Sequence, residues 1–310
     1  MTQVHSSANM SVPSQKNLLI LTGSAGILVI AATIIFGWKV LQFALVSYAI
    51  SFIVEILFAK FRKKKLDVGW YVTPMFFTLL LPPLLPLWMA SVGAAFGVFF
   101  GKAIFGGTGK TIFNPALVGI LFLYVTFPIQ LTQEWIVPTI DLVAGATPLK
   151  ALGGTGEFYY TIRSLLLGNQ NGSVGETFRL GILLLGIGLI VLKVSNWRIP
   201  LSYLGTVFII QLVGNQLNPT LFKDPVLSLL TGGLLLGAFF FATDTTTAPK
   251  TSRGMLLFGL GLGVLTVMIR VYATFVEGVT FSIIIMSAVS PLLDKAPKEI
   301  TAKEGESNEK

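Results

Sequence analysis

The 310-residue chain has no cysteine, and its one histidine, His5, lies near the N-terminus. Iron–sulfur clusters are held by cysteine thiolates, so this chain cannot ligate such a cluster alone. The shortage of histidine likewise argues against a haem or zinc site within the chain. If the protein carries electrons, we therefore expect an organic carrier.

Charge is also scarce: charged residues make up 12% of the chain, hydrophobic residues make up 53%, and the mean hydropathy is +0.79. Soluble domains usually carry about 25% charged residues. Apolar runs of about 18 or more residues recur, which is the length that crosses about 30 Å of hydrocarbon. The first twelve residues lack the cationic region and short apolar core of a secretory signal peptide. These features predict one integral membrane domain with polar ends.

Ten hydrophobic segments predict an all-α polytopic membrane protein with about ten transmembrane helices. The third segment ends at Pro82-Pro83, and because proline interrupts helices we expect a short or broken helix there. The ten segments are 17–36, 40–59, 70–84, 85–105, 112–127, 180–194, 200–214, 224–243, 254–272 and 278–293.

The orientation follows from five basic residues at positions 60 and 62–65, because cytoplasmic loops carry an excess of Lys and Arg. Alternation from that loop places sixteen of the 22 Lys and Arg residues inside and six outside. The net charge of +8 therefore reflects the inner loops of a membrane protein, and no nucleic-acid partner is expected. We expect a multi-pass protein of a bacterial or archaeal cytoplasmic (inner) membrane, with both termini in the cytoplasm.

The expected organisation has five parts: a cytoplasmic tail at 1–16, a first membrane half at 17–127, an external segment at 128–179, a second membrane half at 180–293 and a cytoplasmic tail at 294–310. A weak internal echo supports two halves: the sequence MFFT at 75–78 resembles FFAT at 240–243. Five segments per half would give the copies opposite orientations, as in several transporters. We expect two inverted five-helix halves, with chance similarity as the alternative.

The heptapeptide DLVAGAT at 141–147 is close to a D-x-x-[ST]-G-A-T pattern, in which the final threonine receives FMN through a phosphodiester bond. Asp141, Gly145, Ala146 and Thr147 match this pattern, whereas Ala144 replaces its usual Ser or Thr. Gly145 and Ala146 would leave the backbone accessible to an FMN transferase. The motif predicts covalent FMN on Thr147 at the outer face, and an ordinary polar turn is the alternative.

The stretch GKAIFGGTGKTIFNPALVG at 101–119 is the second candidate site. Thr111 and Asn114 are three residues apart, so we expect them to share a helical face, and Pro115 suits the first turn of a helix. An Asn-Pro pair at membrane depth needs a partner in protein, water or ligand. The stretch is typical either of a small-molecule site at the cytoplasmic side or of a tight helix-packing turn.

Two acidic residues are candidates for a role at membrane depth. Asp244 follows the eighth segment, and such a carboxylate usually pairs or lines a pathway. By position alone, an interfacial helix cap is the simpler interpretation of Asp244. Glu55, inside the second segment, belongs either to an ion pathway or to the interface, and we expect it to reach out towards the nearby lysines.

Taken together, these motifs resemble the D subunit of the Rnf electron-transport complex and, more distantly, the B subunit of the sodium-pumping NADH:quinone oxidoreductase. The resemblance rests on ordered motifs along nearly the whole chain: FGGTGKTIFNPALVG, DLVAGATPL, GSVGET, FFATDTTTAP, EGVTF and SPLLD. It implies FMN on Thr147, a second, non-covalent flavin such as riboflavin near Thr111 and Asn114, and partner subunits. Compact length favours the D subunit.

The resulting hypothesis is a flavin-carrying membrane subunit of a complex that couples electron transfer, of the ferredoxin or NADH type, to sodium or proton translocation. The chain has no dinucleotide fingerprint and no iron–sulfur site, so both chemistries would belong to partner subunits. Glu55 and Asp244 are candidates for the ion path. The rival hypothesis is a channel or secondary transporter for a small solute such as urea or ammonium, since inverted halves also suit that class.

Overall fold

The computed structural model describes residues 13–132, 148–153, 160–168, 170–273 and 278–294. All regular secondary structure in these ranges is helical, and each of the ten hydrophobic segments contains at least one helix. The all-α prediction is therefore confirmed for the described part of the chain.

The first half contains α1 (Gln15–Phe36), α2 (Lys39–Phe61), α3 (Val72–Leu80), α4 (Leu87–Val98) with the π-helical turn η1 (Phe99–Ala103), and α5 (Pro115–Thr126). Three short helices follow, α6 (Pro128–Thr132), α7 (Pro148–Gly153) and α8 (Ile162–Leu167). The second half contains α9 (Arg179–Val191), α10 (Arg198–Leu217), α11 (Pro225–Leu230), α12 (Leu234–Leu236), the π-helical turn η2 (Gly237–Phe241), α13 (Ser252–Tyr272) and α14 (Gly278–Leu293).

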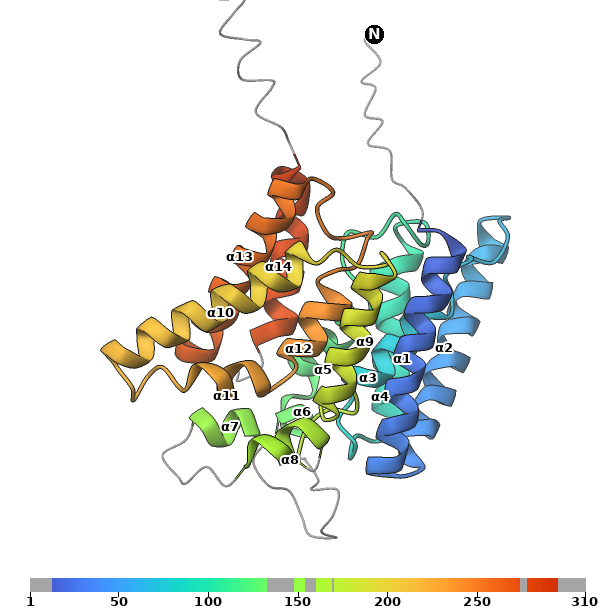
Figure 1. Cartoon of the computed structure of the whole chain (residues 1–310). Helices are drawn as coiled ribbons and strands as arrows, with labels where there is room; N and C mark the ends of the chain where they lie inside the picture. Colours follow the sequence, from blue (N-terminus) through green and yellow to red (C-terminus); the bar gives the residue numbers. More distant parts are fainter. Residues whose placement is uncertain (1–12, 133–147, 154–159, 169, 274–277, 295–310) are drawn as a thin grey trace, which may run out of the picture.

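Figure 1 shows two groups of helices, α1 to α4 on one side and α10, α13 and α14 on the other, with α9 and α12 between them. Helix α2 packs along α4 and α4 along α5, and in the second half α10 packs along α13 and α13 along α14. The start of α1 and the end of α14 lie at the same end of the molecule, and the short helices α7 and α8 lie at the opposite end (Figure 1).

Three helices, α1, α2 and α13, are long and apolar enough to cross a membrane. Four shorter apolar helices accompany them, namely α4 with η1, α5, α9 and α14. Large apolar side chains such as Ile34 and Leu45 are more than 70% exposed on the long helices. Large exposed apolar patches mark interaction surfaces, which here fits contact with lipid.

Two of the hydrophobic segments are broken rather than continuous. Helix α3 ends at Leu80, two residues before Pro82, as the sequence predicts. The segment at 224–243 is broken as well, between α11 and α12, where Gly232 has φ +68°. This second break was not predicted from the sequence. Backbone N–H groups of Val174 and Gly175 donate to the carbonyls of Leu81 and Leu79 (3.0 and 2.7 Å), which satisfies carbonyls at the end of α3.

The two segments of the internal echo contact each other in the centre of the molecule. The ring of Phe76 in α3 lies 6.2 Å from that of Phe240 and 5.3 Å from that of Phe241 in η2, centroid to centroid. Helix α3 begins at the same end of the molecule at which η2 ends, so the two segments run in opposite directions. This arrangement is the one expected near the axis of two inverted halves.

Close packing of α4 on α5 fixes the position at which α5 begins. A Cβ atom on Gly97 would lie 2.5 Å from the carbonyl oxygen of Pro115, and one on Gly119 would lie 2.6 Å from that of Gly93. Only residues without a side chain permit this approach, as is common between membrane helices. The first turn of α5 is therefore held against α4 and against η1, where a Cβ atom on Gly101 would lie 2.6 Å from the Cα atom of Pro115.

Candidate functional site

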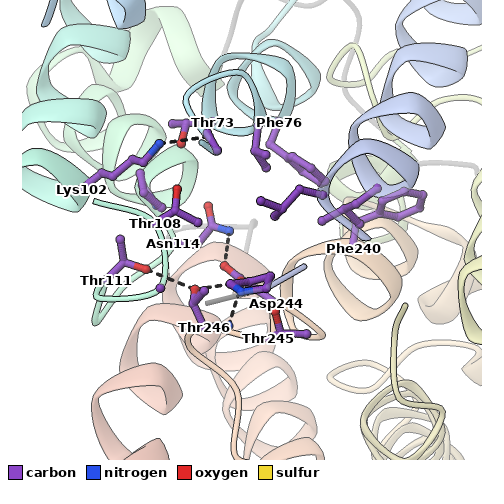
Figure 2. Close-up of a pocket in the computed structure, with 17 residues that line it drawn as sticks. Thr73, Phe76, Lys102, Thr108, Thr111, Asn114, Phe240, Asp244, Thr245 and Thr246 are labelled. Atoms are coloured by element: carbon purple, nitrogen blue, oxygen red, sulfur yellow. Dashed lines mark hydrogen bonds between the residues drawn. The ribbon is translucent and has the colours of Figure 1, made fainter. Parts of the chain in front are cut away.

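A pocket lies where the start of α3, the start of α5, the end of η2 and the loop 104–114 meet (Figure 2). It encloses about 580 Å³ of empty space, including the part open to solvent. Ligand sites usually combine apolar walls with a few polar groups. Here the labelled lining residues are Thr73, Phe76, Lys102, Thr108, Thr111, Asn114, Phe240, Asp244, Thr245 and Thr246.

Asn114 is the N-cap of α5 and also faces the pocket (Figure 2). Its side-chain oxygen accepts a hydrogen bond from the backbone N–H of Ala116 (3.0 Å), and Pro115 occupies the first helical turn, as predicted. The prediction that Thr111 and Asn114 share a helical face is wrong, because the helix begins only after Asn114. Three glycines of the preceding loop, at 106, 107 and 109, have positive φ and delay its start.

Asp244 joins the second half of the chain to Asn114 of the first half. The Asn114 amide donates to one carboxylate oxygen (2.9 Å), and the backbone N–H and hydroxyl of Thr246 donate to the other (3.0 and 2.9 Å). The Thr246 hydroxyl also contacts that of Thr111 at 3.1 Å. Asp244 therefore pairs within the pocket, and the simpler interpretation as an interfacial helix cap is wrong.

The residue Asp244 is partly exposed, but its carboxyl group is enclosed by Asn114 and Thr246. Removal of this group from solvent raises its pKa, while the hydrogen bonds from Thr246 and Asn114 act in the opposite direction. The sequence-predicted residues Thr111, Asn114 and Asp244 thus meet in one hydrogen-bonded chain across the two halves of the molecule.

Next to the pocket lies a charged cluster of Lys102, Glu55 and Asp67. The Lys102 ammonium donates to the carboxylates of Glu55 and Asp67 (2.6 and 2.8 Å) and to the carbonyl of Gly69 (3.0 Å). Lys102 is only 2% exposed and Glu55 only 7%. The expectation that Glu55 reaches towards the lysines of the following loop is therefore wrong, since its partner is Lys102 of η1.

Asp67 lies in the loop between α2 and α3. Burial alone would raise the pKa of its carboxyl group, but the Lys102 ammonium and hydrogen bonds from Lys102 and Thr108 hold the pKa below its usual value. The backbone N–H of Thr108 donates to Asp67 (2.9 Å), so the cluster also fixes the loop that covers the pocket. Lys102 and Asp67 were not predicted as site residues, because charge counting along the sequence placed Lys102 with the cytoplasmic loops.

Asp141, Gly145, Ala146 and Thr147 lie outside the described residues. The described chain resumes at Pro148, in α7, at the end of the molecule opposite to the start of α1 (Figure 1). Because the first turns of α1 contribute Leu18 and Leu21 to the pocket, α7 and the pocket are at opposite ends.

Comparison with known proteins assigns the family. Residues 2–302 match the family described as NQR2, RnfD and RnfE. The chain belongs to this family. The resemblance inferred from the motifs is thereby confirmed over almost the whole length of the chain.

Relatives in the NQR2, RnfD and RnfE family are subunits of redox complexes. The chain is 38% identical, over 80% of its length, to the B subunit of the Na(+)-translocating NADH-quinone reductase of Ectopseudomonas mendocina, and 39% identical, over 80%, to that of Azotobacter vinelandii. It spans 65% of the length of each. It is 35% identical to the D subunit of the proton-translocating ferredoxin:NAD(+) oxidoreductase complex of Clostridium ljungdahlii, over 84% of this chain and 83% of that protein. Identity is similar for the two kinds of relative, and the share of length covered is greater for the ferredoxin:NAD(+) oxidoreductase protein.

Proposed function

We propose that this chain is the flavin-carrying membrane subunit of a multi-subunit complex that couples electron transfer to sodium or proton translocation. Family membership over residues 2–302, together with the names of its relatives, supports this function. The electron donor and acceptor sites of the NAD or ferredoxin type would belong to partner subunits, because this chain has no cysteine and no dinucleotide fingerprint.

The proposal includes ten membrane crossings in two inverted halves, in a bacterial or archaeal cytoplasmic membrane. Both termini would face the cytoplasm. The start of α1 and the end of α14 at one end of the molecule, with α7 and α8 at the other, support this topology (Figure 1). The loop after α2 carries Arg62, Lys63, Lys64 and Lys65, which fits the positive-inside rule. The pocket would then lie on the cytoplasmic side and Thr147 on the outer side.

A second, non-covalent flavin such as riboflavin would occupy the pocket. The residues present fit an isoalloxazine ring: Phe76 and Phe240 form apolar walls, and the Asn114 amide, the Asp244 carboxyl and the threonine hydroxyls offer donors and acceptors for its N–H and C=O groups. When bound, the flavin supplies one- or two-electron chemistry. Asn114 and Asp244 would orient it, and the loop 104–114 would limit its contact with water.

Covalent FMN on Thr147, attached by an FMN transferase, would be the outer electron carrier. The test is the in-gel fluorescence of the denatured chain after coexpression with a transferase. Thr147→Val should abolish the fluorescence of the band, whereas Thr139→Val, a nearby threonine outside the motif, should leave it unchanged. A non-fluorescent wild-type band would instead favour a small-solute channel, and a fluorescent Thr147→Val band would move the attachment site elsewhere.

The second flavin is tested by the amount released on denaturation of the purified Thr147→Val chain. We expect about one released flavin per chain, lost in Asn114→Leu and in Asp244→Ala. Asn215→Leu is the matched control, since the Asn215 amide donates to the carbonyl of Phe222 and its side chain lies outside the pocket. Equal release from all of these variants would show that the flavin binds elsewhere.

A further inference from the structure

Lys102 separates two hollows at the same end of the molecule. On one side it lines the pocket with Asn114 and Asp244 (Figure 2). On the other side it lines a second hollow, with an empty volume of about 420 Å³, together with Glu55 and Asp67. Both carboxylates belong only to this second hollow, so Lys102 is the member of the charged cluster that borders the pocket.

The charges around the pocket are therefore ordered in space. The Lys102 ammonium has three acceptors, from Glu55, Asp67 and Gly69, which match its three N–H donors. The ammonium is thus fixed and shielded from bulk water, while Asp244 is the acidic group of the pocket itself. Exposed Arg62, Lys64 and Lys65 also line the second hollow, but solvent screens charges at that surface.

We propose that Lys102 sets the reduction potential of the redox cofactor in the pocket, and that Glu55 and Asp67 hold its ammonium in place and moderate its charge. This inference rests on the proposed function of the pocket. Reduction adds negative charge to a bound ring, and a fixed ammonium in a poorly screened site stabilises that charge far more than one in water. The electrons come from a reduced centre of a partner subunit, and Lys102 itself exchanges none.

A purely structural role is the competing explanation, because Lys102 joins η1 to α2 through Glu55 and to the loop before α3 through Gly69. A structural role predicts changes in stability without an ordered change in potential. The electrostatic role predicts opposite signs: removal of the ammonium lowers the midpoint potential, whereas neutralisation of Glu55 raises it. The shift for Glu55 should be smaller, because its carboxylate lies behind the ammonium and does not line the pocket.

The experiment is a potentiometric titration of the non-covalent flavin in the purified full chain carrying Thr147→Val, which removes the covalent FMN. Lys102→Met should lower the midpoint by an amount equivalent to about a tenfold change in the ratio of reduced to oxidised flavin, or about 59 mV for a one-electron step. Lys102→Arg keeps the positive charge, so its midpoint potential should lie close to that of the chain with Lys102. Glu55→Gln should raise the midpoint potential.

Two further variants keep the test decisive. Lys102→Met combined with Glu55→Gln removes the ammonium together with one carboxylate, so it should fold even where the single variant does not, and its potential should still lie below wild type. Lys110 is an exposed lysine of the loop 104–114, so Lys110→Met removes the same charge in solvent and should leave the potential unchanged.

Unchanged potentials in the flavin-containing Lys102 variants would overturn the inference, as would shifts of one sign in both Lys102→Met and Glu55→Gln. Failure of the proposed function has a different signature. In that case the Thr147→Val chain holds no releasable flavin, or its flavin does not depend on Asn114. The flavin content of each sample therefore separates the two failures.

Discussion

The two halves of the chain treat a basic side chain near a helix end in different ways. In the first half, Lys102 near the end of the α4–η1 segment pairs with two carboxylates. In the second half, Arg270 near the end of α13 donates instead to the backbone carbonyls of Ser228 and Thr231 (2.9 and 3.1 Å). The basic side chain that lines the pocket therefore has ionic partners, whereas Arg270 has backbone partners.

The neighbouring long helices show the same contrast. Glu55 lies six residues before the end of α2 at Phe61, and Gln211 lies six residues before the end of α10 at Leu217. Glu55 accepts from Lys102, whereas Gln211 accepts from the backbone N–H of Lys223 (3.1 Å). Buried ions are costly and mark functional positions in membrane proteins. At corresponding positions, the first half therefore has ion pairs, whereas the second half has hydrogen bonds to backbone groups.

The largest effect is expected for Lys102→Leu. It leaves Glu55 and Asp67 without their shared cation, and loss of one partner of a buried ion pair costs about 3–5 kcal/mol. Thermal unfolding of the purified chain in detergent measures this loss. Lys102→Leu together with Glu55→Leu should recover part of the stability, and no recovery would mean that packing rather than charge is responsible.

Arg270→Leu in the second half should destabilise the chain less than Lys102→Leu does. Its partners are carbonyls, which remain dipoles rather than orphaned charges, so we expect a loss of about 1.5–3 kcal/mol for the charge-assisted hydrogen bonds. The same unfolding assay gives the comparison. A loss equal to or larger than that of Lys102→Leu would contradict the contrast between the halves.

A steric prediction concerns the packing of α4 on α5. Gly97→Ala should destabilise the chain by about 1–3 kcal/mol, because the added Cβ meets the backbone carbonyl of Pro115 and cannot be relieved by a side-chain rotation. Gly205→Ala in α10 is the matched control, since no atom lies within 4 Å of its Cβ position. The control should be neutral or stabilising by about 0.5–1 kcal/mol. Equal melting temperatures for the two variants would refute this account.

The smallest effect is expected for Thr111→Val, which removes one hydrogen bond between the halves. The Thr246 hydroxyl keeps its bond to Asp244, so the loss should be about 0.5–1.5 kcal/mol. In the Thr147→Val background, Thr111→Val should reduce the amount of bound flavin less than Asn114→Leu does, because Asn114 contacts Asp244 directly. A stronger effect of Thr111 on flavin retention would reverse this ranking.

Local sequence signals predicted much of the fold and part of the pocket. Apolar segment lengths predicted the helices, Pro82-Pro83 predicted the break after α3, and Pro115 predicted the start of α5. The break between α11 and α12 was missed, because a Gly pair in an apolar run does not by itself interrupt a helix as proline does.

Partners distant in sequence could not be predicted in the same way. Asn114 and Asp244 are 130 residues apart, and Lys102 and Glu55 are 47 apart. Asn114, Asp244 and Glu55 were predicted as separate candidates and Lys102 as a loop charge. A single sequence contains no signal that these residues contact one another. Positive-inside counting placed Lys102 in a loop, since the rule depends on residue type near a segment end and not on the direction of the side chain.

The π-helical turns η1 and η2 each end beside the pocket, η1 with Lys102 and η2 just before Asp244. Such a turn holds one residue more than an α-helical turn. Deletion of a single residue from η2 would therefore leave a turn of α-helical width, and the residues before and after it would keep their directions about the helix axis. The same deletion in the α-helical part of α13 would turn the residues that follow by about 100°, so a one-residue deletion should be better tolerated in η2 than in α13.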